Sequence, residues 1–185
     1  MKNICILVIM AIAISANAAT IKWGASGQTK YESTTLTTGK TDIYLVYLGE
    51  SVSDWSSWSY SSDFANTKVD STTTSTLGTV TASSVGVTAG SSIGGLDHIA
   101  NTFNPGASSF GILYMTKQDG KDYYYQGGTF TYSTSSSNYN AAQDMYTYTS
   151  SSAPNASATW KAVPEPSVAL MGLLGLGMLL KRRRA

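Results

Sequence analysis

Cysteine and histidine are almost missing from this chain, which has one residue of each type among its 185. Zinc sites in proteins draw most of their ligands from Cys and His, so we expect no metal site. The single thiol, Cys5, lies in an N-terminal segment that we expect to be removed. His98 could complete a Ser–His–Asp arrangement, but Ser and Asp are so frequent here that their presence indicates nothing. We therefore expect neither a cofactor nor catalytic residues.

Charged residues are scarce as well. They make up 12% of the chain, about half of the ~25% that is usual for a globular domain. All the arginines lie in the last four positions, and between the two terminal segments seven lysines face ten acidic residues, a net charge of −3. Phosphate contacts need clustered Lys and Arg, so this composition argues against a nucleic-acid partner. Hydrophobic residues still reach 42%, enough to bury a core.

The first 18 residues have the pattern of a secretory signal peptide. Lys2 supplies a positive start, and residues 4–14 form an apolar run that is too short to span a membrane comfortably as a helix. Ala16 and Ala18 place small residues at the positions that signal peptidase reads, so we expect cleavage after Ala18.

The C-terminal segment, 163–185, has three parts in a fixed order. Pro164, Glu165 and Pro166 come first, an apolar stretch predicted as a transmembrane helix over 167–180 follows, and Lys181, Arg182, Arg183 and Arg184 close it. The prolines keep the backbone extended and accessible to a protease. The four cations are too costly to cross the bilayer, so they stay cytoplasmic and leave the preceding domain on the other side.

This order resembles the PEP-CTERM sorting signal of Gram-negative bacteria, over about residues 163–184. The resemblance implies that an exosortase in the inner membrane recognises Pro164, Glu165 and Pro166. It also implies cleavage near this motif, delivery to the cell surface or extracellular matrix, and a link to exopolysaccharide and biofilm. The alternative is an ordinary C-terminal membrane anchor with a basic stop.

The passenger between these signals, residues 19–162, has strand patterns rather than helix patterns. Residues 42–48 and 110–116 are β-branched and aromatic runs, and the first lacks alternation, which indicates burial on both faces. Asp119-Gly120 predicts a turn, and strand signals at 123–125 and 129–132 continue beyond it, as in a β-hairpin or meander with Gly127-Gly128 as a bulge or corner. Weaker strand signals lie at 79–81 and 85–88, and 97–103 is the best helix candidate.

These elements add up to an all-β single domain, most simply a sandwich or jelly roll. A β-solenoid is the weaker alternative, because no repeat of constant period is present. The first and last passenger segments, 19–23 and 158–162, are both β-prone and each carries one Trp. We expect them to pair or to lie near each other.

Three aromatic residues in a polar stretch, Trp55, Trp58 and Tyr60, are candidates for stacking on sugar rings. The alternative is that they complete a small core. The leading hypothesis is a non-enzymatic envelope or matrix protein with a structural or adhesive role. A cell-surface carbohydrate-binding module that contacts extracellular polysaccharide is the second hypothesis, and a small hydrolase is the third.

Overall fold

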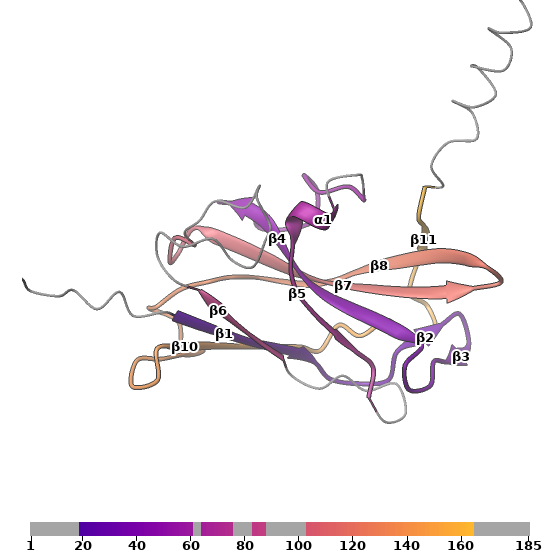
Figure 1. Ribbon diagram of the computed structural model, residues 1–185, viewed down its shortest axis with the longest axis horizontal. Helices are drawn as coiled ribbons and strands as arrows, with labels where there is room; N and C mark the ends of the chain where they lie inside the picture. Colours follow the sequence, from indigo (N-terminus) through magenta and orange to yellow (C-terminus); the bar gives the residue numbers. More distant parts are fainter. Residues whose placement is uncertain (1–18, 61–63, 76–82, 88–102, 165–185) are drawn as a thin grey trace, which may run out of the picture.

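The computed structural model shown in Figure 1 describes residues 19–60, 64–75, 83–87 and 103–164. The described chain is all-β, as predicted, with one short helix, α1 (Phe64–Thr67). The strands are β1 (Ala19–Ala25), β2 (Lys30–Tyr31), β3 (Thr34–Thr35), β4 (Thr41–Glu50), β5 (Lys68–Thr73), β6 (Ser83–Val87), β7 (Ser108–Gln118), β8 (Lys121–Thr131), β9 (Tyr139–Asn140), β10 (Met145–Ser150) and β11 (Lys161–Ala162).

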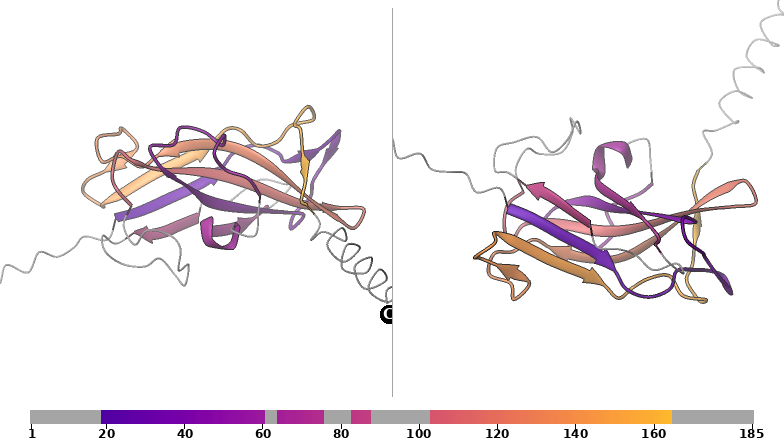
Figure 2. Two further views of the ribbon diagram at one scale, coloured as in Figure 1. Left: turned by 90° about the horizontal axis from the view of Figure 1, so that it is seen from above. Right: turned by 60° about the horizontal axis from the view of Figure 1, so that its bottom comes forward.

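Two open sheets make up the body of the domain. One has four strands in the order β6-β1-β10-β9, and the other has five in the order β11-β8-β7-β4-β5. Neighbours in the five-stranded sheet are antiparallel, whereas β1 and β10 run parallel. The β-solenoid alternative does not fit these strands, because a solenoid stacks parallel strands of successive coils. Figures 1 and 2 show the sheets as two layers with their long strands roughly aligned.

One apolar core lies between the layers. Ile21 and Trp23 of β1 meet Ile43 and Leu45 of β4 and Phe110 of β7 there, and all five side chains are fully buried. Alternate residues of β4 point to the opposite side, where they contribute to a second cluster. The prediction that this strand is buried on both faces is therefore confirmed.

The predicted hairpin is present. β7 and β8 pair up to Gln118 and Lys121, and both turn residues have positive φ, 50° at Asp119 and 79° at Gly120. A turn of this kind needs positive φ at both central positions, which explains the Asp-Gly sequence.

The predicted bulge is also present. Gly111 pairs with Thr129 and Leu113 with Gln126, so that Gly127 and Gly128 together lie opposite a single residue of β7. A Cβ atom at Gly127 would lie 2.7 Å from the ring of Tyr114, and only glycine fits this approach.

The predicted pairing of the first and last passenger segments is wrong. Both edges of β1 are occupied, by β6 and by β10, so no edge is left for β11. β11 instead adds to the far edge of β8, with Lys161 beside Tyr124. In Figure 1, β1 begins at the left end of the domain and β11 lies at the right. The chain therefore leaves the domain at the end opposite to its start.

Several predicted features lie outside the described residues. These are the signal peptide 1–18 with Ala16 and Ala18, the strand signal at 79–81, His98 and all of the candidate helix 97–103 except Phe103, and the tail from Glu165 onward, including Pro166, the apolar stretch 167–180 and the cations 181–184. Among the residues that the structure describes, no helix has both the length and the hydropathy of a membrane span.

Candidate functional site

The outer face of the five-stranded sheet carries a second set of aromatic side chains, which we call the outer aromatic layer. It contains Tyr44, Trp55, Trp58, Tyr60, Phe64 and Tyr124. The segment between β4 and β5 lies over this face and supplies four of the six rings. The rings rest on the outward-facing Val46 and Leu113, which are fully buried.

Trp55 is held at both ends of its indole. Its Nε1 donates a hydrogen bond of 2.8 Å to the carbonyl of Gly127, at the bulge of β8. Its six-membered ring covers Gly111, where a Cβ atom would lie 2.1 Å from Cζ2. A glycine in the middle of β7 is thus required by the close approach of the ring rather than by its own backbone.

Trp58 and Tyr60 complete the layer. The Trp58 ring is edge-on to Trp55, with 5.1 Å between centroids, and its Nε1 donates to the Thr67 hydroxyl at 3.4 Å. Tyr60 stacks on Tyr124 at 5.3 Å and on Phe64 at 5.1 Å. The three candidate sugar-stacking residues are therefore brought together, half-buried and with their rings packed against one another. Such mutual ring packing is typical of a core role.

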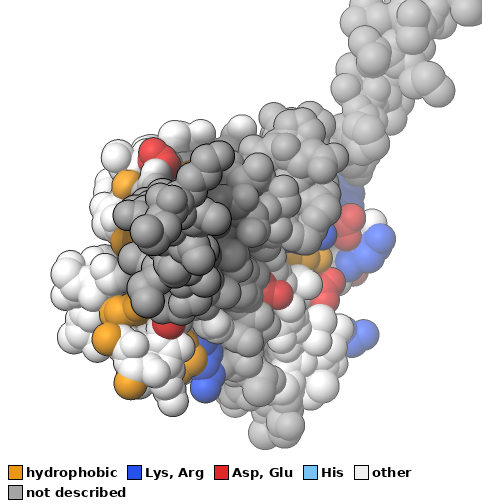
Figure 3. All heavy atoms as spheres, turned by 60° about the vertical axis from the view of Figure 1, so that its left-hand side comes forward, with side chains coloured by type: hydrophobic (Ala, Val, Ile, Leu, Met, Phe, Trp, Pro, Cys, Tyr) orange, Lys and Arg blue, Asp and Glu red, His pale blue; other side chains and the backbone are white. Residues whose placement is uncertain are grey.

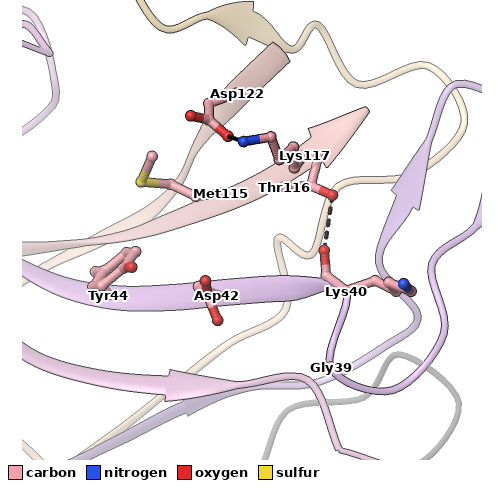
Figure 4. A pocket seen from close by; sticks show the side chains of 8 residues that line it. All are labelled: Gly39, Lys40, Asp42, Tyr44, Met115, Thr116, Lys117 and Asp122. Atoms are coloured by element: carbon pink, nitrogen blue, oxygen red, sulfur yellow. Dashed lines mark hydrogen bonds and ion pairs between the residues drawn. The ribbon is translucent and has the colours of Figure 1, made fainter. Parts of the chain in front are cut away.

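A hollow of about 540 Å³ lies on the same face beside this layer (Figure 4). Its lining comes from β4, β7, β8 and the turn before β4, and comprises Gly39, Lys40, Asp42, Tyr44, Met115, Thr116, Lys117 and Asp122. Tyr44 and Met115 are half-buried, whereas the four charged side chains are exposed. Reasoning from the sequence missed this hollow, since none of its residues forms a recognisable motif.

Two polar contacts, one hydrogen bond and one ion pair, connect residues that line the hollow. The buried Thr116 hydroxyl donates to the carbonyl of Lys40 at 2.8 Å, which ties β7 to the turn before β4. Lys117 faces Asp122 with 3.8 Å between Nζ and Oδ1, and Figure 4 shows this pair on one side of the hollow. Both partners are more than half exposed, so the pair adds little stability and its polar atoms stay accessible.

The pKa values of two phenols next to the hollow are raised by their surroundings. Burial raises the pKa of Tyr44, and the negative charge of Asp42 raises it further. Burial likewise raises the pKa of Tyr60, with a contribution from Asp122. Both shifts keep the phenols protonated and able to donate a hydrogen bond at neutral pH.

The described part of the chain contains neither Cys nor His. No group of three or more His, Cys, Asp or Glu side chains there is placed to hold a metal ion.

A motif that the sequence reasoning missed lies at residues 90–94. They read Gly-Ser-Ser-Ile-Gly, which fits the Gly-x-Ser-x-Gly pattern of serine hydrolases. Like His98, this segment lies outside the described residues. In a chain so rich in Gly and Ser, the pattern alone carries little weight.

Of the predicted sorting motif, the structure describes only Pro164. It lies two residues after the end of β11 and is exposed. The preceding residue, Val163, is held to the sheet by a hydrogen bond of 2.9 Å from its amide to the carbonyl of Asp122. The ordered sheet thus ends within one residue of the motif.

Comparison with protein-family models, with curated proteins and with solved structures gives no significant match for this chain. The resemblance of the tail to a sorting signal therefore stands on the residues of the tail alone.

Proposed function

We propose that this chain is a non-enzymatic exported protein of the cell envelope or extracellular matrix, sorted through its C-terminal PEP motif by an exosortase. Signal peptidase removes residues 1–18, and the 167–180 helix holds the precursor in the inner membrane with the passenger in the periplasm. Exosortase cleavage then delivers the passenger to the cell surface or matrix, where it has a structural or adhesive role in exopolysaccharide or biofilm.

The proposal rests above all on the sequence of the tail, in which Pro164-Glu165-Pro166 comes first, an apolar stretch second and four cations last. The exposed position of Pro164, two residues after the end of the edge strand β11, supports it, because a protease needs an extended segment clear of the folded domain. The two-layer arrangement of open sheets supports a sandwich or jelly-roll passenger.

The surface chemistry agrees with an extracellular polymer environment rather than a nucleic-acid partner. On the face seen in Figure 3, most described atoms are neither hydrophobic side chains nor charged ones, and acidic and basic side chains lie near one another. All the cations of the passenger are lysines.

Intact-mass analysis of the protein from its native host, after separation of inner membrane, periplasm and matrix, tests the proposal. We expect a mature form that starts near Ala19 and ends near Pro164, found outside the inner membrane. A form that retains Lys181–Arg184 and stays in the inner membrane would instead indicate an ordinary anchor and would remove the exosortase from the account.

The hydrolase alternative has its own test. A screen of ester and glycoside substrates, followed by Ser92→Ala and His98→Ala, would have to show an activity that both substitutions abolish. We expect no such activity.

A further inference from the structure

The hollow beside the outer aromatic layer combines apolar side chains with polar groups of both kinds. Tyr44 and Met115 are half-buried and Thr116 is buried, while Asp42, Lys117 and Asp122 are exposed. Its volume, about 540 Å³, falls among the ~300–1,000 Å³ of small-molecule sites. Such sites use apolar surface for affinity and a few polar groups for orientation.

The charges of the residues that line the hollow balance. Two lysines, Lys40 and Lys117, accompany two aspartates, Asp42 and Asp122. An anionic ligand would meet two carboxylates, and a cation would meet two ammonium groups, so neither sign is favoured. The hollow therefore suits an uncharged ligand with many hydrogen-bonding groups.

Saccharide hydroxyls meet this requirement because each one both donates and accepts, as the hydroxyls of Ser and Thr do. The carboxylates of Asp42 and Asp122 can only accept, and the lysines can only donate, so together they satisfy both properties of a hydroxyl. The apolar face of a sugar ring can rest on the phenyl ring of Tyr44 and on the thioether of Met115.

We propose that this hollow binds one or two units of an uncharged polysaccharide, with Asp42, Lys117 and Asp122 holding the hydroxyls and Tyr44 supporting the ring. The inference rests on the adhesive role proposed above, for which it names the class of ligand. It moves sugar binding from Trp55, Trp58 and Tyr60, which do not line the hollow, to Tyr44, the one ring of the outer aromatic layer that does. The Tyr44 ring also meets Phe64 edge-on, with 5.2 Å between centroids, and has Lys68 Nζ 5.3 Å from its centroid.

The test uses the full-length chain purified in a mild detergent. Binding is measured on an array of neutral cello-, malto-, xylo- and β-1,3-gluco-oligosaccharides, with anionic uronic-acid oligosaccharides alongside. We expect a neutral oligosaccharide to bind, with an affinity that changes less than about twofold between ~0.05 M and ~0.5 M salt, because no net charge is neutralised.

Asp42→Asn and Lys117→Met should each weaken that binding about tenfold, the loss typical of one hydrogen bond to a charged group. Both positions are exposed, so the fold should be unaffected. Glu32→Gln and Lys22→Ala are the matched controls, since both are exposed residues away from the hollow, and they should leave affinity unchanged.

Three results would overturn the inference: no binding to any neutral oligosaccharide, salt-sensitive binding to the anionic ones only, or binding that survives both substitutions. Loss with Trp58→Ala but not with Asp42→Asn would return the site to the outer aromatic layer. The binding test is independent of the sorting test. A correctly processed protein that binds no sugar would contradict only this inference. An unprocessed protein that binds sugar would contradict only the sorting proposal.

Discussion

The indole of Trp23 in one sheet donates a hydrogen bond of 2.6 Å to the carboxylate of Asp70 in the other. Trp23 is fully buried in the centre of the core, and Asp70 is partly buried on the edge strand β5. A buried indole N–H needs an acceptor, and the Asp70 carboxylate supplies it. The two layers are thus held in register by a polar contact as well as by apolar packing.

Removal of this acceptor should destabilise the domain. Asp70→Ala leaves the Trp23 N–H buried without its partner, and we expect a loss of about 1–3 kcal/mol in the free energy of unfolding. Urea unfolding followed by tryptophan fluorescence would show a lower midpoint with an unchanged slope. In a double-mutant cycle, Asp70→Ala should cost much less in a Trp23→Phe background. Equal costs in both backgrounds would mean that the contact contributes nothing.

The close approach of Trp55 to β7 predicts a penalty at Gly111. The added methyl group of Gly111→Ala would lie 2.1 Å from the ring, so the indole must leave its place and lose its bond to Gly127. We expect a destabilisation of about 1–3 kcal/mol and a red-shifted tryptophan emission. The control is the same substitution in a Trp55→Ala background, where the methyl group has room. A full penalty there would place the cause in the backbone of β7 instead.

The Tyr139 phenol should make stability fall at high pH. Its hydrogen bond to Asp144, together with burial and the charge of that carboxylate, raises the pKa of Tyr139 to about 12, against 10.0 for a free phenol. A raised folded-state pKa stabilises the fold fully below pH 10, and the contribution is lost as the pH rises from 10 to 12. Urea midpoints across this range should fall less steeply for Tyr139→Phe, because no proton remains to be lost at that site. Identical slopes for the two proteins would contradict the assignment.

Substitution of the PEP motif should separate sorting from folding. Replacing Pro164, Glu165 and Pro166 by alanine should leave the described sheets intact, because among the described residues Val163 is the last one bonded to them. We expect the variant to fold normally but to keep its C-terminal cations and to accumulate in the inner membrane. Intact mass and fractionation measure both properties. Normal release of the variant would exclude the motif as the recognition element.

Short stretches of sequence were enough to predict the hairpin turn, the bulge and the burial of β4, because these features depend on residues close together in the chain. Asp119-Gly120 has the positive φ values that a two-residue hairpin needs, Gly127-Gly128 forms the bulge, and the aromatic run of β4 is buried on both faces. Each follows from turn chemistry or strand propensity, which act over a few residues. The terminal signals are also local patterns, and they stay predictions because they lie outside the described residues.

Tertiary structure alone decided which distant segments meet. β1 lies parallel to β10, although the sequence led us to expect it beside the last passenger strand. Asp70 accepts a hydrogen bond from Trp23 across the core. The hollow arises where β4, β7 and β8 bring four charged residues around Tyr44 and Met115. No periodic pattern in the sequence predicts these long-range contacts. Pairing of strands far apart in the sequence depends on how two whole sheet faces bury their apolar surface together. The sequence by itself thus determined the hairpin and its bulge and predicts the terminal sorting signals, while the surface that we propose for binding exists only in the folded sheet.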